Sequence, residues 1–181
     1  MENRIRQLMQ KQTGFRLLNY IGFNAGWAAT VWGAGNGLYW LGPLATLVFV
    51  PLHIGLSPNP RGEARLLLVL AVLGTILETG FMMTGVVTYR GTLSGYPLVP
   101  FYITTLWMMY GSTLNHSMGW MRRSWQLALV AGLAFGPFSY IVAERLGAVT
   151  LEGGFISLVI LALAWGPANA GSVALAIRFD K

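Results

Sequence analysis

The chain has 181 residues, of which 55% are hydrophobic and only 10% charged, and its mean hydropathy is +0.57. Soluble domains carry roughly a quarter charged residues, and a compact soluble fold of this size could not bury so much apolar surface. The composition therefore excludes a soluble globular domain, a disordered tail and a nucleic-acid-binding module. The absence of cysteine from the sequence also excludes disulfides, thiolate metal sites and cysteine nucleophiles.

The N-terminal segment, residues 1–16, is basic and precedes the first apolar stretch. Ile5, Leu8 and Met9 recur at helical spacing beside Arg4 and Arg6, a pattern typical of a short amphipathic helix that lies on a membrane surface. A solvated tail fits the same residues equally well. The segment does not resemble a signal peptide, because the apolar run that follows continues past any plausible small-residue cleavage site.

Six apolar segments follow, each long enough for a hydrocarbon core about 30 Å thick, which needs roughly 17 to 25 helical residues. They are uniformly hydrophobic rather than alternating, which favours helices, and helices satisfy their own backbone hydrogen bonds in lipid. The sequence therefore predicts an all-α integral membrane bundle in one polytopic domain over residues 1–181. The predicted spans are Leu17–Gly35, Tyr39–Leu56, Leu66–Thr88, Leu98–Ser117, Trp125–Ala143 and Phe155–Ile177.

The basic residues are distributed unequally between the two sides that these spans define. One side receives ten of the twelve basic residues, and the other side receives only Arg90 and Arg145. Because positively charged loops stay in the cytoplasm, both termini are predicted to be cytoplasmic. The net charge of +6 is explained by this topology and does not require a nucleic-acid partner.

Glu78 is the clearest candidate for a functional residue. It lies near the middle of the third predicted span, and its helical neighbours include Ala71, Gly74 and Gly85. An ionisable group at membrane depth usually faces protein or water and is a default functional candidate. We expect Glu78 to point into a helix contact or cavity and to be largely protonated, so that it can donate a proton as a general acid does. A structural hydrogen bond to a neighbouring helix is the alternative.

Other polar residues are predicted to lie in the middle or the cytoplasmic half of the spans, on four further helices. His116 is the candidate partner of Glu78 in catalysis, and the others are candidate ligand-binding residues. Two histidines with a glutamate can bind a metal, but no pair has ligand spacing on one helix, so we expect no metal site. The candidates are Asn24, His53, Asn115, His116 and Asn169.

Aromatic residues are predicted in two places. Several lie at span ends, as in the interfacial belt of membrane proteins, whereas Trp107 and Tyr110 lie deeper, on the same face of the fourth span as Asn115. Aromatic walls beside a polar cluster suit an amphipathic or isoprenoid-like ligand, or a carbocation held by cation–π attraction. Ordinary helix packing produces the same pattern.

The fourth and fifth spans resemble an uncharacterised family of bacterial inner-membrane proteins, domain of unknown function 2878. The strings that carry the resemblance are L-N-H-S at 114–117 and G-P-x-S-Y-x-x-x-E-R-L-G-A-V at 136–149. The resemblance implies a bacterial inner membrane and a compact helical bundle. It also implies a lipid-linked role, since members often neighbour genes for lipid modification. It implies no established activity and no catalytic residues.

Three hypotheses fit these observations. The first is a protein that binds a lipid or isoprenoid in an intramembrane cavity and catalyses its proton-driven isomerisation or cyclisation. The second is a proton-coupled small transporter or lipid flippase, and the third is a scaffold subunit without chemistry. The expected partners are membrane lipids and a hydrophobic small molecule, with a homo-oligomer or a larger membrane complex also open. No cofactor and no nucleic acid is expected, since the chain contains no nucleotide or phosphate-binding motif.

Overall fold

The structure, a computed structural model, describes residues 2–93 and 95–181, with side chains from residue 13 onward. This part of the chain contains six α-helices, one 3-10 helix and two three-residue strands, so the helical fold class is confirmed with a small sheet in addition. The helices are α1 (Glu2–Gly35), α2 (Leu41–Leu56), α3 (Pro60–Met83), α4 (Phe101–Thr113), η1 (Gly119–Arg123), α5 (Trp125–Arg145) and α6 (Phe155–Phe179). The strands are β1 (Val87–Tyr89) and β2 (Val149–Leu151), which pair antiparallel.

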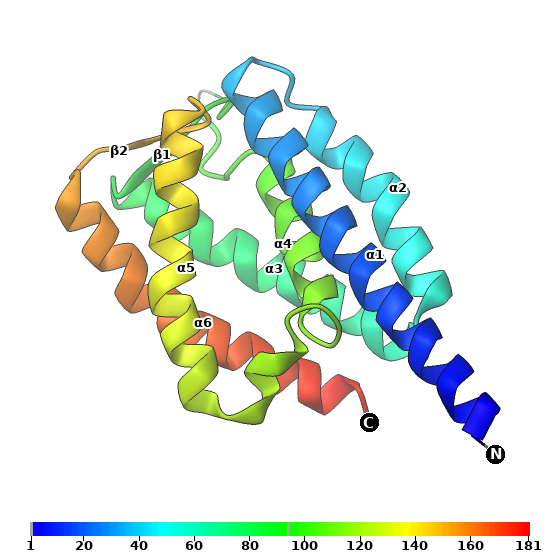
Figure 1. The fold of residues 1–181 in the computed structure, drawn as a ribbon. Helices are drawn as coiled ribbons and strands as arrows, with labels where there is room; N and C mark the ends of the chain where they lie inside the picture. The colour runs from blue at the N-terminus through cyan, green and yellow to red at the C-terminus, as the bar shows by residue number, and fades with distance from the viewer. Residues whose placement is uncertain (1, 94) are drawn as a thin grey trace.

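The chain runs back and forth between two ends of the bundle (Figure 1). At one end the Asn59 side chain donates to the carbonyl oxygen of Phe179 at 3.1 Å, and Arg122 pairs with Asp180 at 2.8 Å. We call this the basic end, because it holds Arg16, Arg61, Arg65, Arg122, Arg123, Arg178 and Lys181.

The opposite end, which we call the sheet end, holds the two strands and the loops beside them (Figure 1). Here Arg90 donates to the carbonyl oxygen of Gly35 at 2.5 Å, and the Tyr102 hydroxyl donates to the carbonyl oxygen of Arg90 at 2.8 Å. These bonds join the C-terminal end of α1 to the loop before α4.

The last two helices start at the predicted residues. α5 begins at Trp125 because the Ser124 hydroxyl caps it, accepting a hydrogen bond from the Leu127 amide at 3.2 Å. α6 begins at Phe155 and extends two residues beyond the predicted end at Ile177.

The third predicted span is displaced toward the basic end. α3 begins at Pro60, which suits a first helical position, and Asn59 caps it by accepting from the Gly62 amide at 3.0 Å. The predicted end at Thr88 is wrong, because Gly85 adopts a φ of +69° and ends the helix. Glu78 consequently lies five residues before the last residue of α3, nearer the sheet end than the middle.

The fourth predicted span, Leu98–Ser117, is too long. Pro100 precedes the first helical residue, and the amides of His116 and Met118 both bond to the Thr113 carbonyl oxygen in a turn that replaces the helix. The thirteen residues of α4 extend only about 20 Å at 1.5 Å per residue. The turns and η1 complete the path to the basic end.

The outward surface of the bundle is apolar. Leu47 on α2, Ile76 on α3 and Leu163 on α6 are each more than 60% exposed. Among the described residues, α3, α5 and α6 are long and apolar enough to cross a membrane, and α2 is apolar but shorter. Apolar residues outside and polar residues inside are the arrangement expected of a protein whose surroundings are lipid.

The first helix continues from the N-terminal segment without a break, since α1 begins at Glu2 rather than at the predicted Leu17. The side chains of residues 1–12 lie outside the described part of the chain. The predicted amphipathic face of residues 1–16, which depends on those side chains, therefore stays a prediction.

Close packing of α5 on α6 depends on a pair of glycines four residues apart. Gly132 and Gly136 both face Trp165 of α6, and a Cβ on Gly132 would fall 2.7 Å from the Cβ of Asn169. The two helices form the most extensive pairing in the bundle. The absence of side chains at these positions lets the backbones approach closely.

We predict that Gly132→Ala lowers the melting temperature in detergent, because the added methyl group overlaps α6 and overpacking costs about 1–3 kcal/mol. Gly171→Ala is the matched control, since Gly171 lies on α6 with no atom near the position of a new Cβ. Alanine should be neutral or slightly stabilising there. Equal melting temperatures for the two variants would contradict this packing.

Candidate functional site

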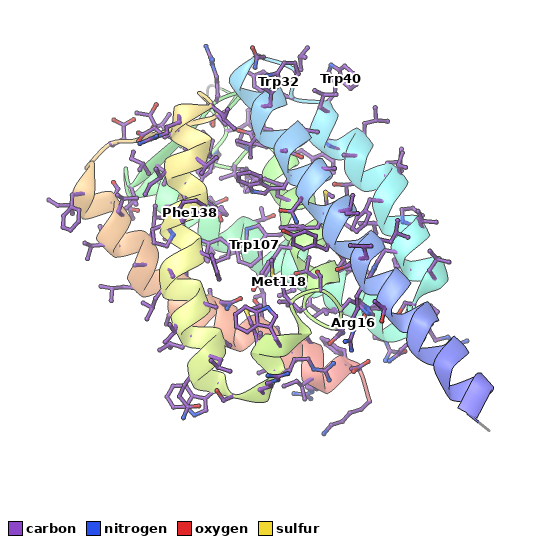
Figure 2. All side chains as sticks on the ribbon, in the orientation of Figure 1. Arg16, Trp32, Trp40, Trp107, Met118 and Phe138 are labelled. Carbon is purple, nitrogen blue, oxygen red and sulfur yellow. The ribbon has the colours of Figure 1, made fainter. Side chains whose placement is uncertain are left out.

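A cavity of about 330 Å³ lies between α1 and α5, within the size range of small-molecule sites. Its wall is mostly apolar and comes chiefly from α1, α4, α5 and α6, with Glu78 of α3 and Tyr89 of β1. Figure 2 shows Trp107 and Met118 in the space between α1 and α5, with Phe138 beside it on α5. The cavity is lined among others by Phe23, Trp27, Leu106, Met118, Phe135 and Phe138.

The cavity reaches the outer surface of the bundle on one side. Phe135 and Phe138 both line it and are both 61% exposed. Asn24, on the facing side of α1, is also exposed. The opening therefore lies along the apolar flank of the helices, where lipid chains would surround a membrane protein.

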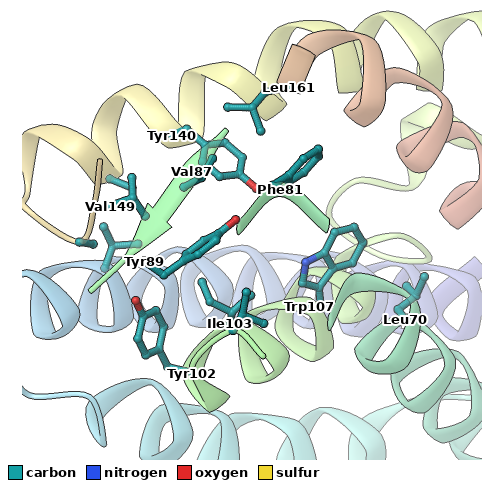
Figure 3. Close-up of a cluster of buried hydrophobic side chains, with 14 of the residues drawn as sticks. Leu70, Phe81, Val87, Tyr89, Tyr102, Ile103, Trp107, Tyr140, Val149 and Leu161 are labelled. Carbon is teal, nitrogen blue, oxygen red and sulfur yellow. The ribbon is translucent and has the colours of Figure 1, made fainter. Parts of the chain in front are cut away.

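Glu78 is the buried acidic group of this cavity, at 3% exposure. Tyr140 donates to its Oε2 at 2.5 Å, Tyr89 donates to the same oxygen, and the Trp107 ring nitrogen donates to Oε1 at 3.1 Å. In Figure 3 the two hydroxyl groups and the indole nitrogen point into a common space. Among the described residues no lysine, arginine or histidine forms an ion pair with this carboxyl.

The sequence explains how three distant segments meet at Glu78. Trp107 packs on Gly74, one turn before Glu78, where a larger side chain would overlap the indole ring. The left-handed Gly85 turns the chain into β1, whose last residue is Tyr89, and the pairing of Tyr89 with Val149 fixes that strand. The predicted small-residue stripe on α3 therefore accommodates an aromatic ring.

Aromatic and amide groups extend the polar wall away from Glu78. The rings of Trp107 and Trp165 stack with centroids 4.8 Å apart, and the Trp165 nitrogen donates to the Tyr140 hydroxyl at 3.3 Å. Tyr110 donates to Asn169, whose own amide donates to the carbonyl oxygen of Ala128 at 2.5 Å. One side of the cavity is thus aromatic and hydrogen-bonded, whereas the opening is aliphatic and phenylalanine-rich.

A second polar cluster lies at the basic end. The Nε2 atoms of His53 and His116 lie 3.1 and 3.0 Å from the two carboxylate oxygens of Glu63. The Asn115 amide also donates to Glu63 at 3.0 Å, and Asn19 lies 3.3 Å from the other ring nitrogen of His53. None of these residues lines the cavity.

The structure divides the predicted site residues between these two places. Five of them line the cavity, and three belong to the cluster at the basic end. His116, predicted as the partner of Glu78, is paired with Glu63 instead. The cavity residues are Glu78, Asn24, Trp107, Tyr110 and Asn169, and the cluster residues are His53, Asn115 and His116.

Sequence reasoning missed four residues that complete these sites. Tyr89 lies in a strand that was read as the end of a helix, and Glu63 lies before the third predicted span. Tyr140 and Trp165 are ordinary membrane aromatics by composition. The available signal was the four-residue spacing of Gly136 and Tyr140, which are both buried on the face of α5 that packs inward.

The comparisons with known proteins identify a family and no activity. No curated protein and no solved structure matches the chain. Residues 16–169 match DUF2878, a family described as a protein of unknown function. The match covers the second half of α1, all of α2 to α5 and part of α6, and therefore includes both polar sites. The chain belongs to the DUF2878 family.

Proposed function

We propose that this chain is a six-span protein of the bacterial inner membrane that binds a lipid or isoprenoid in the cavity between α1 and α5. We further propose that Glu78 exchanges a proton with the bound molecule. The observation that carries the proposal is the position of Glu78, a buried carboxyl held by three hydrogen-bond donors, in the wall of an apolar cavity that opens on the flank of the bundle.

The shape of the cavity supports an apolar ligand. A long, flexible chain could enter between Phe23 on α1 and Phe135 on α5 without passing through either polar end of the bundle. The ligand would leave lipid for a site of similar polarity, so affinity would come from contact with aromatic rings and from polar groups at the inner wall. The hydrogen-bonded pair of Tyr110 and Asn169 lines the same cavity and would hold its polar end.

The carboxyl of Glu78 suits a proton-transfer isomerisation. In the acid form it would donate its proton to one carbon of a double bond and leave a carbocation on the other. The carboxylate would then accept a proton from a neighbouring carbon, which moves the double bond and restores the acid. Trp107 and Trp165 would stabilise the cation through their ring faces, and Tyr140 takes the partner role first assigned to His116.

The experiment is mass spectrometry of the molecules that co-purify with the protein in mild detergent. Ala131 is buried in α5 and lines the cavity, so Ala131→Phe should fill it and remove the bound molecule. Ala134→Phe is the matched control, because Ala134 is exposed on the same helix. We expect a specific apolar molecule in wild type and in Ala134→Phe, and its loss from Ala131→Phe.

The same comparison distinguishes the other hypotheses. Both variants must elute from size exclusion like wild type, so that loss of the ligand is not loss of the fold. Only bulk phospholipid in all three samples would contradict the proposal. That result would favour a proton-coupled transporter or a scaffold, in which no molecule stays in the cavity.

The orientation is tested by labelling single cysteines, since the chain contains none. Because the basic end is expected in the cytoplasm, Tyr96→Cys at the sheet end should react with a membrane-impermeant maleimide in intact spheroplasts. Lys181→Cys should react only after the membrane is permeabilised. Both native side chains are exposed, and the reverse pattern would contradict cytoplasmic termini.

A further inference from the structure

The cluster at the basic end brings together ligand atoms from three elements. His53 comes from α2, Glu63 from the first turn of α3 and His116 from the turn after α4. One ligand atom from each of the three residues lies within 4.8 Å of the others. The chain has only these two histidines, and both point their Nε2 atoms at the same carboxylate.

The cluster is enclosed. His53 and Glu63 are each 2% exposed, and the side chain of His116 is 11% exposed. The Phe15 ring stacks on His53 with centroids 5.5 Å apart and meets His116 edge-on at 4.7 Å, and Phe49 covers His53 at 5.9 Å. Two imidazoles and a carboxylate in such an apolar shell are costly unless they are paired with each other or bound to an ion.

We propose that His53, Glu63 and His116 bind one divalent transition-metal ion, of the class of Zn²⁺ or Fe²⁺. Two histidine nitrogens and one carboxylate form a ligand set that suits both ions and leaves a position open for water or a substrate. Atoms bound to one ion at about 2.0–2.2 Å lie roughly 3 Å apart. In the structure the Nε2 atoms of His53 and His116 lie 3.1 and 3.0 Å from different oxygens of Glu63, so a carboxylate that binds the ion through both oxygens has separations of this length.

Asn115 supplies an independent indication. Its amide nitrogen donates to Oε1 of Glu63 at 3.0 Å, which orients the carboxylate as outer groups do in metal sites. In the part of the chain that the structure describes, its Oδ1 is the one buried side-chain oxygen or nitrogen with no hydrogen-bond partner. A water bound at the open position of the ion would donate to this oxygen.

Asn19 sets a condition on the site. Its amide nitrogen lies 3.3 Å from Nδ1 of His53 and donates to the carbonyl oxygen of Ser112 at 3.0 Å. A metal-bound imidazole usually donates from its free nitrogen to an acceptor. Metal binding therefore requires the Asn19 amide to turn and present its oxygen to His53, which gives up its bonds to Ser112 and Ser117. An aspartate at position 19 would offer an acceptor without that turn.

The sequence could not indicate this site, because the argument against a metal considered only ligands spaced along one helix. Here each ligand comes from a different element, and Glu63 lies outside the predicted spans. Since the chain has no cysteine and no further histidine, histidine-dependent metal binding by the protein reports on this cluster alone. The site is separate from the cavity, so its test does not depend on the proposed lipid ligand.

The experiment measures metal content in protein carrying a histidine-free affinity tag. The protein is produced with added zinc or iron, purified in mild detergent and analysed by inductively coupled plasma mass spectrometry. We expect about one ion per chain in wild type and at least tenfold less in Glu63→Gln. Zn²⁺ titration against a competing chelator should show roughly 10–100-fold weaker binding in Asn115→Ala, since outer groups change affinity by that much. Asn19→Asp should bind Zn²⁺ more tightly than wild type.

Three variants make the outcome decisive. Glu152→Gln, an exposed glutamate in the loop before α6, is the control and should keep the wild-type metal content. Asn115→Ala and Asn19→Asp retain all three ligands, so they report on the site even when Glu63→Gln does not fold. Wild type with no more metal than Glu63→Gln, or unchanged Zn²⁺ affinity in both Asn115→Ala and Asn19→Asp, would overturn the proposal. The cluster would then be a hydrogen-bonded group of Glu63 and two histidines.

Discussion

The hydrogen bonding of the Glu78 carboxyl is the constraint on which the sheet end of this molecule depends. A carboxyl removed from water with no charged partner must find donors within the protein. Its donors come from β1, α4 and α5, three segments that meet at this carboxyl. The short strand pairing is part of this arrangement, because it holds Tyr89 under the end of α3. Removal of any donor would leave the carboxyl with fewer hydrogen bonds, and a buried polar group without its partner costs about 1–3 kcal/mol of folding stability.

The two polar sites lie toward opposite ends of the bundle. Glu78 lies toward the sheet end, in the wall of an apolar cavity, whereas Glu63 lies at the basic end between two histidines. Both are on α3, fifteen residues apart, and α3 therefore connects them. In a bundle whose outer surface is apolar, these interior groups are the default candidates for function, since ionisable residues within membrane helices are expensive to keep.

The sequence predicts the helices better than it predicts their ends. Uniform hydrophobicity identifies six helices, and the predicted starts of α5 and α6 are correct. The end of α3 and the length of α4 were missed for local reasons. Gly85 lies within an apolar stretch of the sequence, and only its positive φ in the structure shows that the helix ends there. Asn115–Ser117 directly follow an apolar segment and were therefore assigned to the same helix, but their backbone forms turns.

The candidate site was predicted only in part. Glu78 is identifiable because a carboxyl in an apolar segment has a clear energetic cost. Its partners are not, because tyrosine and tryptophan are common in membrane helices and only the three-dimensional path of the chain selects Tyr89 and Tyr140. His116 was predicted to be the catalytic partner of Glu78 because both residues were expected in the middle or cytoplasmic half of the spans. The structure pairs it with Glu63, since the turn after α4 directs it toward the start of α3.

The most direct test of the central claim compares the molecule bound to wild type with that bound to Glu78→Gln. Glutamine keeps the size of the side chain but carries no acidic proton. If Glu78 moves a double bond, the two proteins should hold molecules of equal mass that differ in chromatographic retention, substrate in the variant and product in wild type. Identical molecules in both proteins, with a folded variant and full occupancy, would contradict a role for Glu78 in proton transfer.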